Sequence, residues 1–432
     1  MVKTIVVLGA GMAGLPLAHY LVSKTAAKHS DVRVVLVSPN AEFYWNVASI
    51  RFVAAPDQFP EEKYLYPIAK EFAKHPNSKD QFEFVLGKAE TLEPDKNSVT
   101  IRLNDDEDGN SASPRFRTID YHTLVIATGS RYRGAMPWKE VGTSQQTRAA
   151  IARLQRDIQA ARSIVVAGAG VTGVEFAGEL ASEYLGQGRC WGWGWGGSGN
   201  GSEKKEVTIV SADPLPLEPR LRESVRKTAK YELERLGVKF IGGARIIAGA
   251  DDDDGDQDGN GKEKNQKQKT VELTSRDGSK QTIAADLVIP TYGLVPNTEF
   301  APASMKDASS GRLRQDRHLR AAGHDNVFVL GDAGDLQAPQ AINAEAQLRY
   351  LMQKLNGAYL ETGTVAEDKE EEYKFDPDGV MIGLTIGRDR GTGQVGNFQP
   401  WSFFIWALKR DLGASKSAQY AAGLIGFNGA WP

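Results

Sequence analysis

The sequence predicts an α/β fold with two parallel sheets, because one pattern of strand, glycine turn and helix occurs twice. The first copy lies at residues 4–23, where an apolar, β-branched run leads into GAGMAG. The second lies at residues 163–184 and carries GAGVTG in the same place. In addition, apolar strands at 121–130 and 286–293 each end in a glycine and close one copy. Such runs are typical of buried parallel strands, so we expect two Rossmann-like dinucleotide-binding domains, the second inserted in the first.

The glycine spacing of the first copy gives each glycine a separate task. Gly9 permits the tight turn, Gly11 lets the backbone approach a pyrophosphate, and Gly14 lets the next helix pack closely on the strand. The helix predicted over 15–23 directs its N-terminus at the phosphates. The turn residues expected to contact the cofactor are Gly9, Ala10, Gly11, Met12, Ala13 and Gly14.

The second strand, over 32–37, should end in an acidic residue that binds the adenosine ribose. Ser38 and Asn40 stand there instead, and either side chain could bind a ribose hydroxyl more weakly than a carboxylate does. The aromatic-rich residues 42–52 are well placed to cover the first cofactor, with Arg51 near its pyrophosphate. The alternative is a loop that packs its aromatic side chains into the core.

Two further strands are predicted over 81–89 and 98–103, and the polar residues 104–113 should form a solvated hairpin loop. The next strand ends in Thr128 and Gly129. In a nucleotide-binding fold this is where the chain leaves for the following domain, so we expect both residues at the first cofactor.

A helix over 144–161 precedes the second glycine turn. The dinucleotide-binding residues of that turn should be Gly168, Gly170 and Gly173. The helix behind it carries Glu175 and Glu179 four residues apart, so both fall on one face. Glu175 is the candidate catalytic residue. Carboxylates near a helix start are also favoured by the helix dipole, an explanation of equal weight for Glu175 and of greater weight for Glu179.

The strand at 206–210 leads to Ser211. An acidic residue there would favour NADH and a nearby arginine would favour NADPH, so the choice between the two stays open. The Gly/Trp-rich stretch 186–202 is interpreted as a surface insertion, with membrane or partner contact as the alternative. The polar stretch 251–269 is interpreted as a loop, since it lacks the final glutamate of a calcium-binding EF-hand.

The region from residue 286 to residue 352 indicates a flavin. One apolar strand ends in Gly293 and marks the exit from the second domain, and another ends in Gly331 and Asp332. Behind two nucleotide folds, such an aspartate commonly meets a flavin ribityl chain. The helix predicted over 339–352 could direct its N-terminus at the pyrimidine end of the ring system and stabilise negative charge there.

Residues 373–432 are expected to form a small C-terminal α+β region. Strand-like segments at 380–386 and 392–398 precede residues 401–410, an aromatic segment with a basic end. That segment resembles an interfacial helix that touches a membrane. A helix packed on a substrate tunnel or on a dimer surface is equally compatible with the pattern.

Composition excludes several classes of protein. The formal net charge of −3 argues against a general nucleic-acid-binding surface. The single cysteine, Cys190, cannot form the redox cysteine pair of a disulfide reductase. The six histidines show no metal-ligand spacing, so no metal is expected. We also expect no transmembrane helix and no leader before the first strand, and Val2 excludes N-myristoylation.

Five motifs in chain order resemble one family: FYWNVASIR, ATGS, GAGVTGVEFAGEL, NVFVLGDAGDLQAP and IGRDRGTGQ. They resemble the two-dinucleotide-binding flavoprotein oxidoreductases, and within these the apoptosis-inducing-factor-like and ferroptosis-suppressor-like branch, which is related to type II NADH dehydrogenases. The resemblance covers nearly the whole chain apart from the insertions. It implies FAD, NADH or NADPH as reductant, and a quinone as electron acceptor. The residues that it implies at FAD include Gly9, Gly11, Gly14, Arg51, Ala89, Gly129 and Asp332.

The chain departs from this family pattern at two positions. Ser38 replaces the acidic ribose ligand. Gln340 replaces a lysine that would face the flavin, and both Gln340 and the following Ala341 are expected to contact the cofactor. A lysine there would help to stabilise reduced flavin, so its loss leaves the acceptor open. Under this reading NAD(P)H gives hydride to FAD, and Glu175 orients the nicotinamide or relays a quinone proton.

The resemblance implies a domain order of 1–135 and 291–372 for FAD, 136–290 for NAD(P)H, and 373–432 for the C-terminal region. Two alternatives stay open: a reductase of a pathway-specific metabolite or protein partner, and a redox-sensing protein related to apoptosis. We expect a cytoplasmic protein, with peripheral contact to the mitochondrial outer membrane or a lipid droplet as an option. A homodimer is compatible with the sequence.

Overall fold

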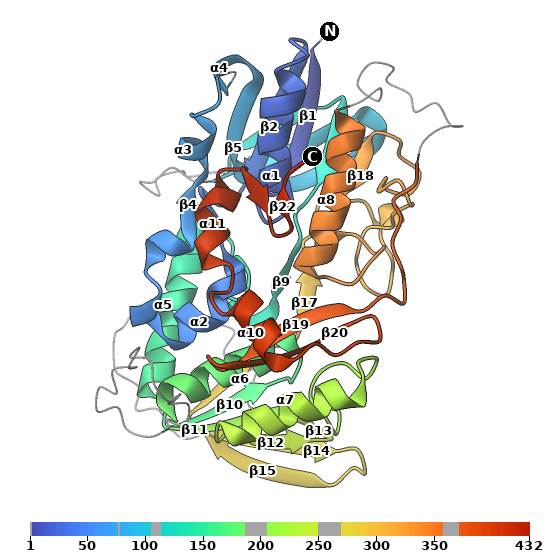
Figure 1. The fold of residues 1–432 in the computed structure, drawn as a ribbon. Coiled ribbons are helices and arrows are strands. Elements are labelled where there is room, and N and C mark those ends of the chain that lie inside the picture. The colour runs from blue at the N-terminus through green and yellow to red at the C-terminus, as the bar shows by residue number, and fades with distance from the viewer. Residues whose placement is uncertain (1, 77, 105–113, 186–204, 249–268, 357–370) are drawn as a thin grey trace.

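The computed structural model describes residues 2–76, 78–104, 114–185, 205–248, 269–356 and 371–432 (Figure 1). The two largest sheets of the described chain lie at opposite ends of the molecule, with the C-terminal elements between and across them. The expectations for 104–113, 186–202 and 251–269 fall wholly or almost wholly outside these residues.

The first sheet has seven strands in the order β18-β8-β1-β2-β5-β6-β7. The strands from β18 to β5 pair in parallel, and β5, β6 and β7 continue as an antiparallel extension. The bounds are β1 Lys3–Leu8, β2 Val32–Ser38, β5 Phe82–Glu93, β6 Ser98–Leu103, β7 Phe116–Asp120, β8 Thr123–Ile126 and β18 Val327–Val329. The sheet thus takes one strand from far along the chain, as expected for a domain that another interrupts.

Helices α1 (Gly14–Tyr20) and α8 (Ala341–Leu355) lie beside each other against this sheet (Figure 1). Helix α1 continues without a break into the wider π-helical turn η1 (Leu21–Ala26). A helix over 15–23 is therefore confirmed, although its second half is wound more loosely than expected.

The second sheet has four parallel strands in the order β12-β11-β10-β16. Their bounds are β10 Ser163–Ala167, β11 Glu206–Ser211, β12 Lys239–Gly242 and β16 Leu287–Pro290. The accompanying helices are α5 Ser144–Ala160, α6 Val171–Tyr184 and α7 Glu223–Arg235. An antiparallel sheet of β13 Ala244–Ala248, β14 Lys269–Ser275 and β15 Lys280–Ala285 packs alongside. The predicted α/β class with two Rossmann-like units is confirmed.

The chain crosses between the two units through one antiparallel ribbon. It consists of β9 (Ser130–Tyr132) on the outward path and β17 (Leu294–Pro296) on the return. Next to the ribbon, the Asn297 side-chain amide donates to the Thr128 carbonyl at 2.9 Å, and the Asn297 N–H donates to the Gly129 carbonyl at 2.9 Å. The exit strand of the first unit is thereby fixed to the re-entry strand.

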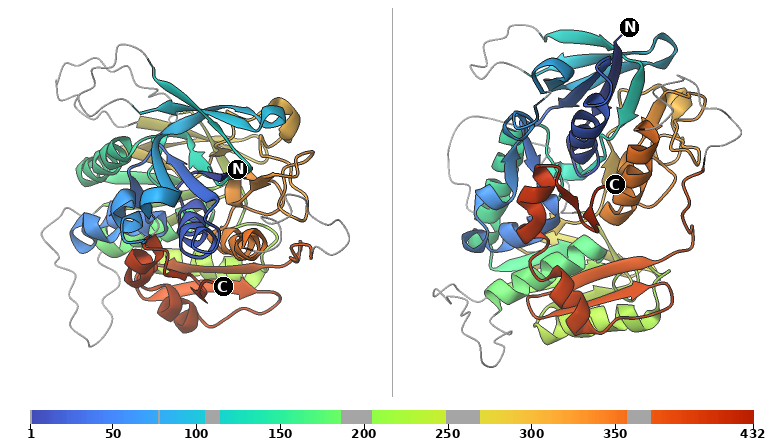
Figure 2. Two further views of the ribbon diagram at one scale, coloured as in Figure 1. Left: turned by 90° about the horizontal axis from the view of Figure 1, so that it is seen from above. Right: turned by 45° about the horizontal axis from the view of Figure 1, so that its top comes forward.

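The C-terminal region joins both units (Figure 2). Hairpin β19–β20 packs on α6 and α7 of the second unit, helix α10 packs on the hairpin, and α11 packs on α1 of the first unit. The bounds are β19 Met381–Ile386, β20 Arg390–Val395, α10 Ser402–Lys409, α11 Ala414–Ala421, β21 Ile425–Gly426 and β22 Gly429–Ala430.

The aromatic segment 42–52 belongs to the core of the first unit. Phe43, Trp45 and Phe52 are fully buried, and Trp45 packs against Tyr420 of α11. The alternative interpretation, in which this segment packs its aromatic side chains into the core, therefore describes them. The short elements here are β3 Glu42–Tyr44, β4 Leu65–Pro67, α2 Ser49–Ala54, α3 Ile68–Phe72 and α4 Ser78–Gln81.

Candidate functional site

The first glycine turn has the geometry that its sequence predicts. Gly9 has φ +101°, a left-handed value that residues with a side chain rarely adopt. A Cβ added to Gly14 would lie 1.9 Å from the Gly9 carbonyl oxygen, so only glycine lets the helix approach. A Cβ on Gly11 would meet no atom within 4 Å. The space beside the second glycine is therefore the place where a pyrophosphate can approach the backbone.

The second glycine turn repeats this geometry in the other unit. Gly168 has φ +105°, and a Cβ on Gly173 would lie 2.0 Å from the Gly168 carbonyl oxygen. The space beside Gly170 is again open. Thr291, which follows β16, donates its hydroxyl to the Gly168 carbonyl at 2.9 Å and fixes the turn. Both turns therefore fit a dinucleotide, one on each sheet.

The ends of β2 and β11 are also alike, because a serine closes each strand. The Ser38 hydroxyl accepts the Asn40 N–H at 3.1 Å, and the Ser211 hydroxyl accepts the Asp213 N–H at 3.2 Å. Both side chains are buried. Each serine therefore shapes the turn at the expected ribose position, and the sequence supplies no carboxylate at either one.

Asp332 is buried in the 3-10 turn Gly331–Ala333, which follows β18. Its carboxylate accepts the Ser130 hydroxyl and the Lys139 ammonium, each at 2.6 Å. Burial alone would raise the pKa of Asp332, but Lys139 and Ser130 outweigh burial and hold the pKa below its usual value. Asp332 is therefore an ionised acceptor, as a ligand for ribityl hydroxyls should be.

Lys139 and its neighbour Glu140 were missed by sequence reasoning. The Tyr44 hydroxyl donates to the Pro137 carbonyl at 2.6 Å, and the Asn46 amide donates to the Trp138 carbonyl at 3.3 Å. These bonds hold the segment between the aromatic core and Asp332. Burial raises the pKa of Glu140 to about 7, against the opposing charge of Lys139.

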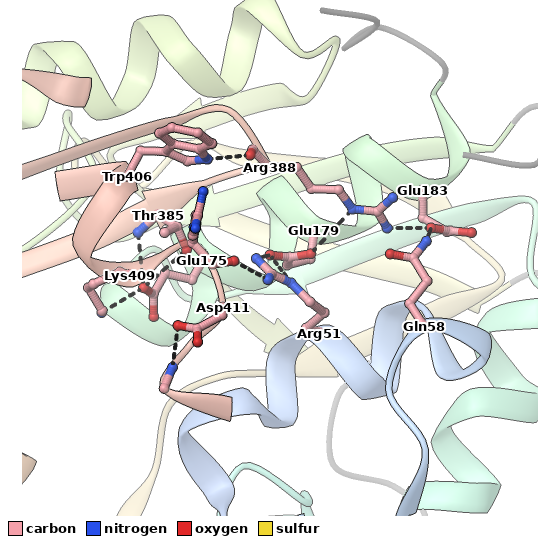
Figure 3. A network of polar contacts seen from close by, with 12 residues as sticks. Arg51, Gln58, Glu175, Glu179, Glu183, Thr385, Arg388, Trp406, Lys409 and Asp411 are labelled. Carbon is pink, nitrogen blue, oxygen red and sulfur yellow. Dashed lines mark hydrogen bonds and ion pairs between the residues drawn. The ribbon is translucent and has the colours of Figure 1, made fainter. Parts of the chain in front are cut away.

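Glu175 stands on α6 just beyond the second glycine turn, but its partners come from the C-terminal region (Figure 3). Its carboxylate accepts the Thr385 N–H at 3.0 Å and the Lys409 ammonium at 3.1 Å. Lys409 also donates to the Gly383 carbonyl at 2.7 Å. Glu175 is thus held where the second unit meets β19 and α10.

Arg51 is directed at the same helix (Figure 3). Its Nε and Nη2 donate to one oxygen of Glu179 at 3.0 and 2.6 Å, and its Nη1 donates to the Arg410 carbonyl. Arg388 contacts the other oxygen of Glu179 at 3.9 Å and also pairs with Glu183. Arg51 therefore links α2, α6 and the C-terminal region, and its predicted contact with a pyrophosphate stays a prediction.

The other predicted cofactor residues lie at strand ends and helix starts. Ala89 is buried within β5, and Thr128 follows β8. Gly129, Gly293 and Gly331 all have positive φ values and make the turns that leave their strands. Gln340 precedes α8 as its N-cap without a side-chain capping bond, and Ala341 is the first residue of that helix. The contacts of these residues with a cofactor stay predictions.

Comparisons with known proteins support the resemblance seen in the motifs. The chain is 34% identical to Oxidoreductase ptaL of Pestalotiopsis fici over 95% of this chain and 96% of that one. It is 27% identical to human Ferroptosis suppressor protein 1 over 96% of this chain and 94% of that one. Its fold is similar to that of the sulfide:quinone oxidoreductase of Aquifex aeolicus, with TM-score 0.69, 14% identity and coverage of 98% and 92%.

A family model decides the membership of the chain. It matches residues 3–347, a span that contains both glycine turns, Asp332 and the start of α8. The likeness to Ferroptosis suppressor protein 1 agrees with the branch that the motifs indicated. Since one cysteine occurs in the whole sequence, the chain lacks the cysteine pair to which the family name refers. By its sequence and its fold, this chain belongs to the pyridine nucleotide-disulphide oxidoreductase family.

Proposed function

We propose that the chain is an FAD-dependent NAD(P)H oxidoreductase that passes electrons to a quinone-type acceptor. The observation that carries this proposal is the pair of equivalent glycine turns, at Gly9–Gly14 on one sheet and at Gly168–Gly173 on the other. When bound, the flavin supplies the redox chemistry by accepting hydride from the nicotinamide and passing electrons to the quinone. The Aquifex protein of similar fold is named a sulfide:quinone oxidoreductase, which supports a quinone as the acceptor class.

The chain contributes binding and orientation at this site. The first turn, Asp332 and the start of α8 would hold FAD, and the second turn would hold the nicotinamide dinucleotide. Glu175 would orient the nicotinamide or hold a proton for the quinone, since Thr385 and Lys409 fix its carboxylate where the second unit meets the C-terminal region.

An anaerobic titration tests this proposal. The purified protein should show bound-flavin absorbance that bleaches with NADH or NADPH and returns when a short-chain ubiquinone is added. The nucleotide that bleaches it at lower concentration is the preferred reductant. A protein that holds no flavin, even after incubation with FAD, would refute the proposal. Bleaching that no quinone reverses would refute the acceptor and keep the cofactors.

Gln340 favours a second candidate function, a reductase that acts on a specific metabolite. The side chain at the N-cap of α8 is neutral, whereas the resemblance leads us to expect a lysine there. Because a neutral group stabilises reduced flavin less than a cation does, the flavin should have a lower reduction potential, which suits an acceptor that is harder to reduce than a general quinone. Changing Gln340 to lysine should then raise the flavin reduction potential and slow reoxidation of the reduced flavin; an unchanged potential would remove the support for this second candidate.

We further propose that α10 makes peripheral contact with a lipid surface. Trp401, Phe403 and Leu408 are 74%, 66% and 79% exposed, and Phe398 and Phe404 are exposed beside them. Arg410 follows the helix and is exposed as well, so the patch combines aromatic side chains with positive charge. In the described part of the chain, no helix is long and apolar enough to cross a membrane.

Flotation with anionic liposomes tests this contact. The wild type should float, and the double variant F403S/F404S should not, because both side chains are exposed and their loss spares the core. Wild-type protein that stays at the bottom would refute the contact. A concentration-dependent dimer in the same protein would instead assign the patch to a second copy of the chain.

A further inference from the structure

The C-terminal strap, defined here as residues 411–431, lies across the two helices that begin at the flavin site (Figure 1). Helix α11 of the strap packs on α1. The N–H groups of Phe427 and Asn428, in the hairpin turn, donate to Glu345 of α8 at 2.7 and 3.1 Å. The strap also reaches the first glycine turn directly, because the Tyr420 hydroxyl donates to the Met12 carbonyl at 2.6 Å.

The Met12 carbonyl lacks the partner that a helix would normally give it. The Leu15 N–H donates to Gly11 at 3.1 Å and the Leu17 N–H donates to Ala13 at 3.3 Å. The bond between these two would run from residue 16 to Met12, but residue 16 is proline and has no N–H. The Tyr420 hydroxyl supplies the missing donor.

Tyr420 is suited to this task. It is buried, and burial raises the pKa of its phenol, so the hydroxyl stays protonated and remains a donor. Its ring packs against Phe43 and Trp45, which fixes the direction of the hydroxyl.

The hydrogen bond from Tyr420 fixes the orientation of one peptide unit in the first glycine turn. The Met12 carbonyl and the Ala13 N–H belong to one planar trans peptide unit, so they point in opposite directions. The Ala13 N–H donates to no protein acceptor within the residues that the structure describes. We propose that Tyr420 is a positioning residue for FAD, whose hydroxyl orients the Met12–Ala13 peptide so that the Ala13 N–H faces the pyrophosphate.

This inference rests on the proposed function of the first turn and adds to it a residue that the family motifs do not contain. It also gives the strap a role in cofactor retention. The chain offers a matched control in Tyr66, whose hydroxyl hydrogen-bonds the Ser417 hydroxyl at 2.6 Å. That bond also joins the first unit to α11, but it touches neither glycine turn.

The test compares the dissociation constant of FAD in the full-length holoprotein, measured from the fluorescence of free flavin in a dilution series. Y420F should raise the Kd about fivefold to tenfold, because one buried hydrogen bond is lost. Y66F should leave the Kd within about twofold of the wild type. Adding P16A to Y420F should restore affinity, since an N–H at residue 16 can again bond the Met12 carbonyl.

Each outcome distinguishes this inference from the function on which it rests. Equal Kd values for Y420F and the wild type, or equal losses in Y420F and Y66F, would refute the role of Tyr420 alone. Failure of P16A to restore affinity would refute the orientation of the peptide as the cause. A wild-type protein that holds no FAD would refute the proposed function itself.

Discussion

Replacing Arg51 with methionine (R51M) tests whether this arginine joins the units or binds the cofactor. The change removes both hydrogen bonds to Glu179, which is 0% exposed. The other oxygen of Glu179 accepts no hydrogen bond in the described part of the chain, and Arg388 stands 3.9 Å away. The variant therefore leaves a buried carboxylate with one distant cation.

Breaking a buried ion pair from one side typically costs about 3–5 kcal/mol. Because Arg388 stays near Glu179, we expect a loss at the lower end, about 3 kcal/mol. At roughly 2 °C for each kcal/mol, the melting temperature of R51M should fall by about 6 °C. Differential scanning calorimetry on the full chain measures this shift, and the visible absorbance of the same sample gives the FAD content.

The double variant R51M/E179Q provides the control. Removing the charge of Glu179 takes away the reason for the loss, so the double variant should recover most of the melting temperature and keep its FAD. A double variant no more stable than R51M would refute the ion-pair reasoning. One that is stable but has lost FAD would show that Arg51 binds the pyrophosphate after all.

Three further predictions concern ionisable groups of the described structure. Burial, with His75 adding to it, lowers the pKa of His19 from 6.5 to about 3, so the unfolded state binds more protons between these values. The free energy of unfolding should therefore fall by a few kcal/mol as the pH drops below about 6.5, and H19Q should reduce this dependence in chemical denaturation. For Glu140, burial raises the pKa from 4.5 to about 7, so its contribution to stability is lost as the pH rises through this range. E140Q should then be more stable than the wild type at pH 8, by roughly 1–3 kcal/mol, and no more stable at pH 4. Finally, NAD(P)H should bleach the flavin of E175Q at least about tenfold more slowly than that of the wild type, or quinone should reoxidise it more slowly, while the FAD content is unchanged. Unaltered stopped-flow rates would remove Glu175 from the mechanism.

The sequence predicts the two units well because their determinants are local. Each glycine turn follows a β-branched strand that is buried on both faces, and the spacing of Gly9, Gly11 and Gly14 between a strand and a helix is typical of a dinucleotide-binding turn. The strand ends that carry Thr128 and Asp332 follow from the same pattern. For that reason the sequence alone predicts the fold class and the positions of the two glycine turns.

The contacts that complete the site could not be predicted from the sequence, because they join residues far apart in the chain. Lys139 meets Asp332, and Tyr420 meets Met12, across separations of 193 and 408 residues. The sequence around Lys139 or Tyr420 contains no motif that indicates its hydrogen-bond partner. Helix α11 escaped prediction because its sequence, ASKSAQYA, is short and consists mostly of small and polar residues.

The aromatic segment 42–52 shows a second limit of sequence reasoning. A run of aromatic side chains fits a cover over a cofactor and a packed core equally well. The choice depends on what else packs there, and here Tyr420 and Phe427 of the strap fill the space beside Trp45. Because α11 was not predicted, packing of these aromatic side chains into the core could be given only as an alternative.

The most direct test of the central claim compares G14A with G173A, since the two changes disturb equivalent positions of the two turns. In each, the added Cβ would lie about 2 Å from a carbonyl oxygen, at 1.9 Å in the first turn and 2.0 Å in the second. We predict that folded G14A is colourless, and that G173A keeps bound-flavin absorbance that NAD(P)H no longer bleaches. Flavin retained in G14A and lost in G173A would contradict the assignment of the two sites.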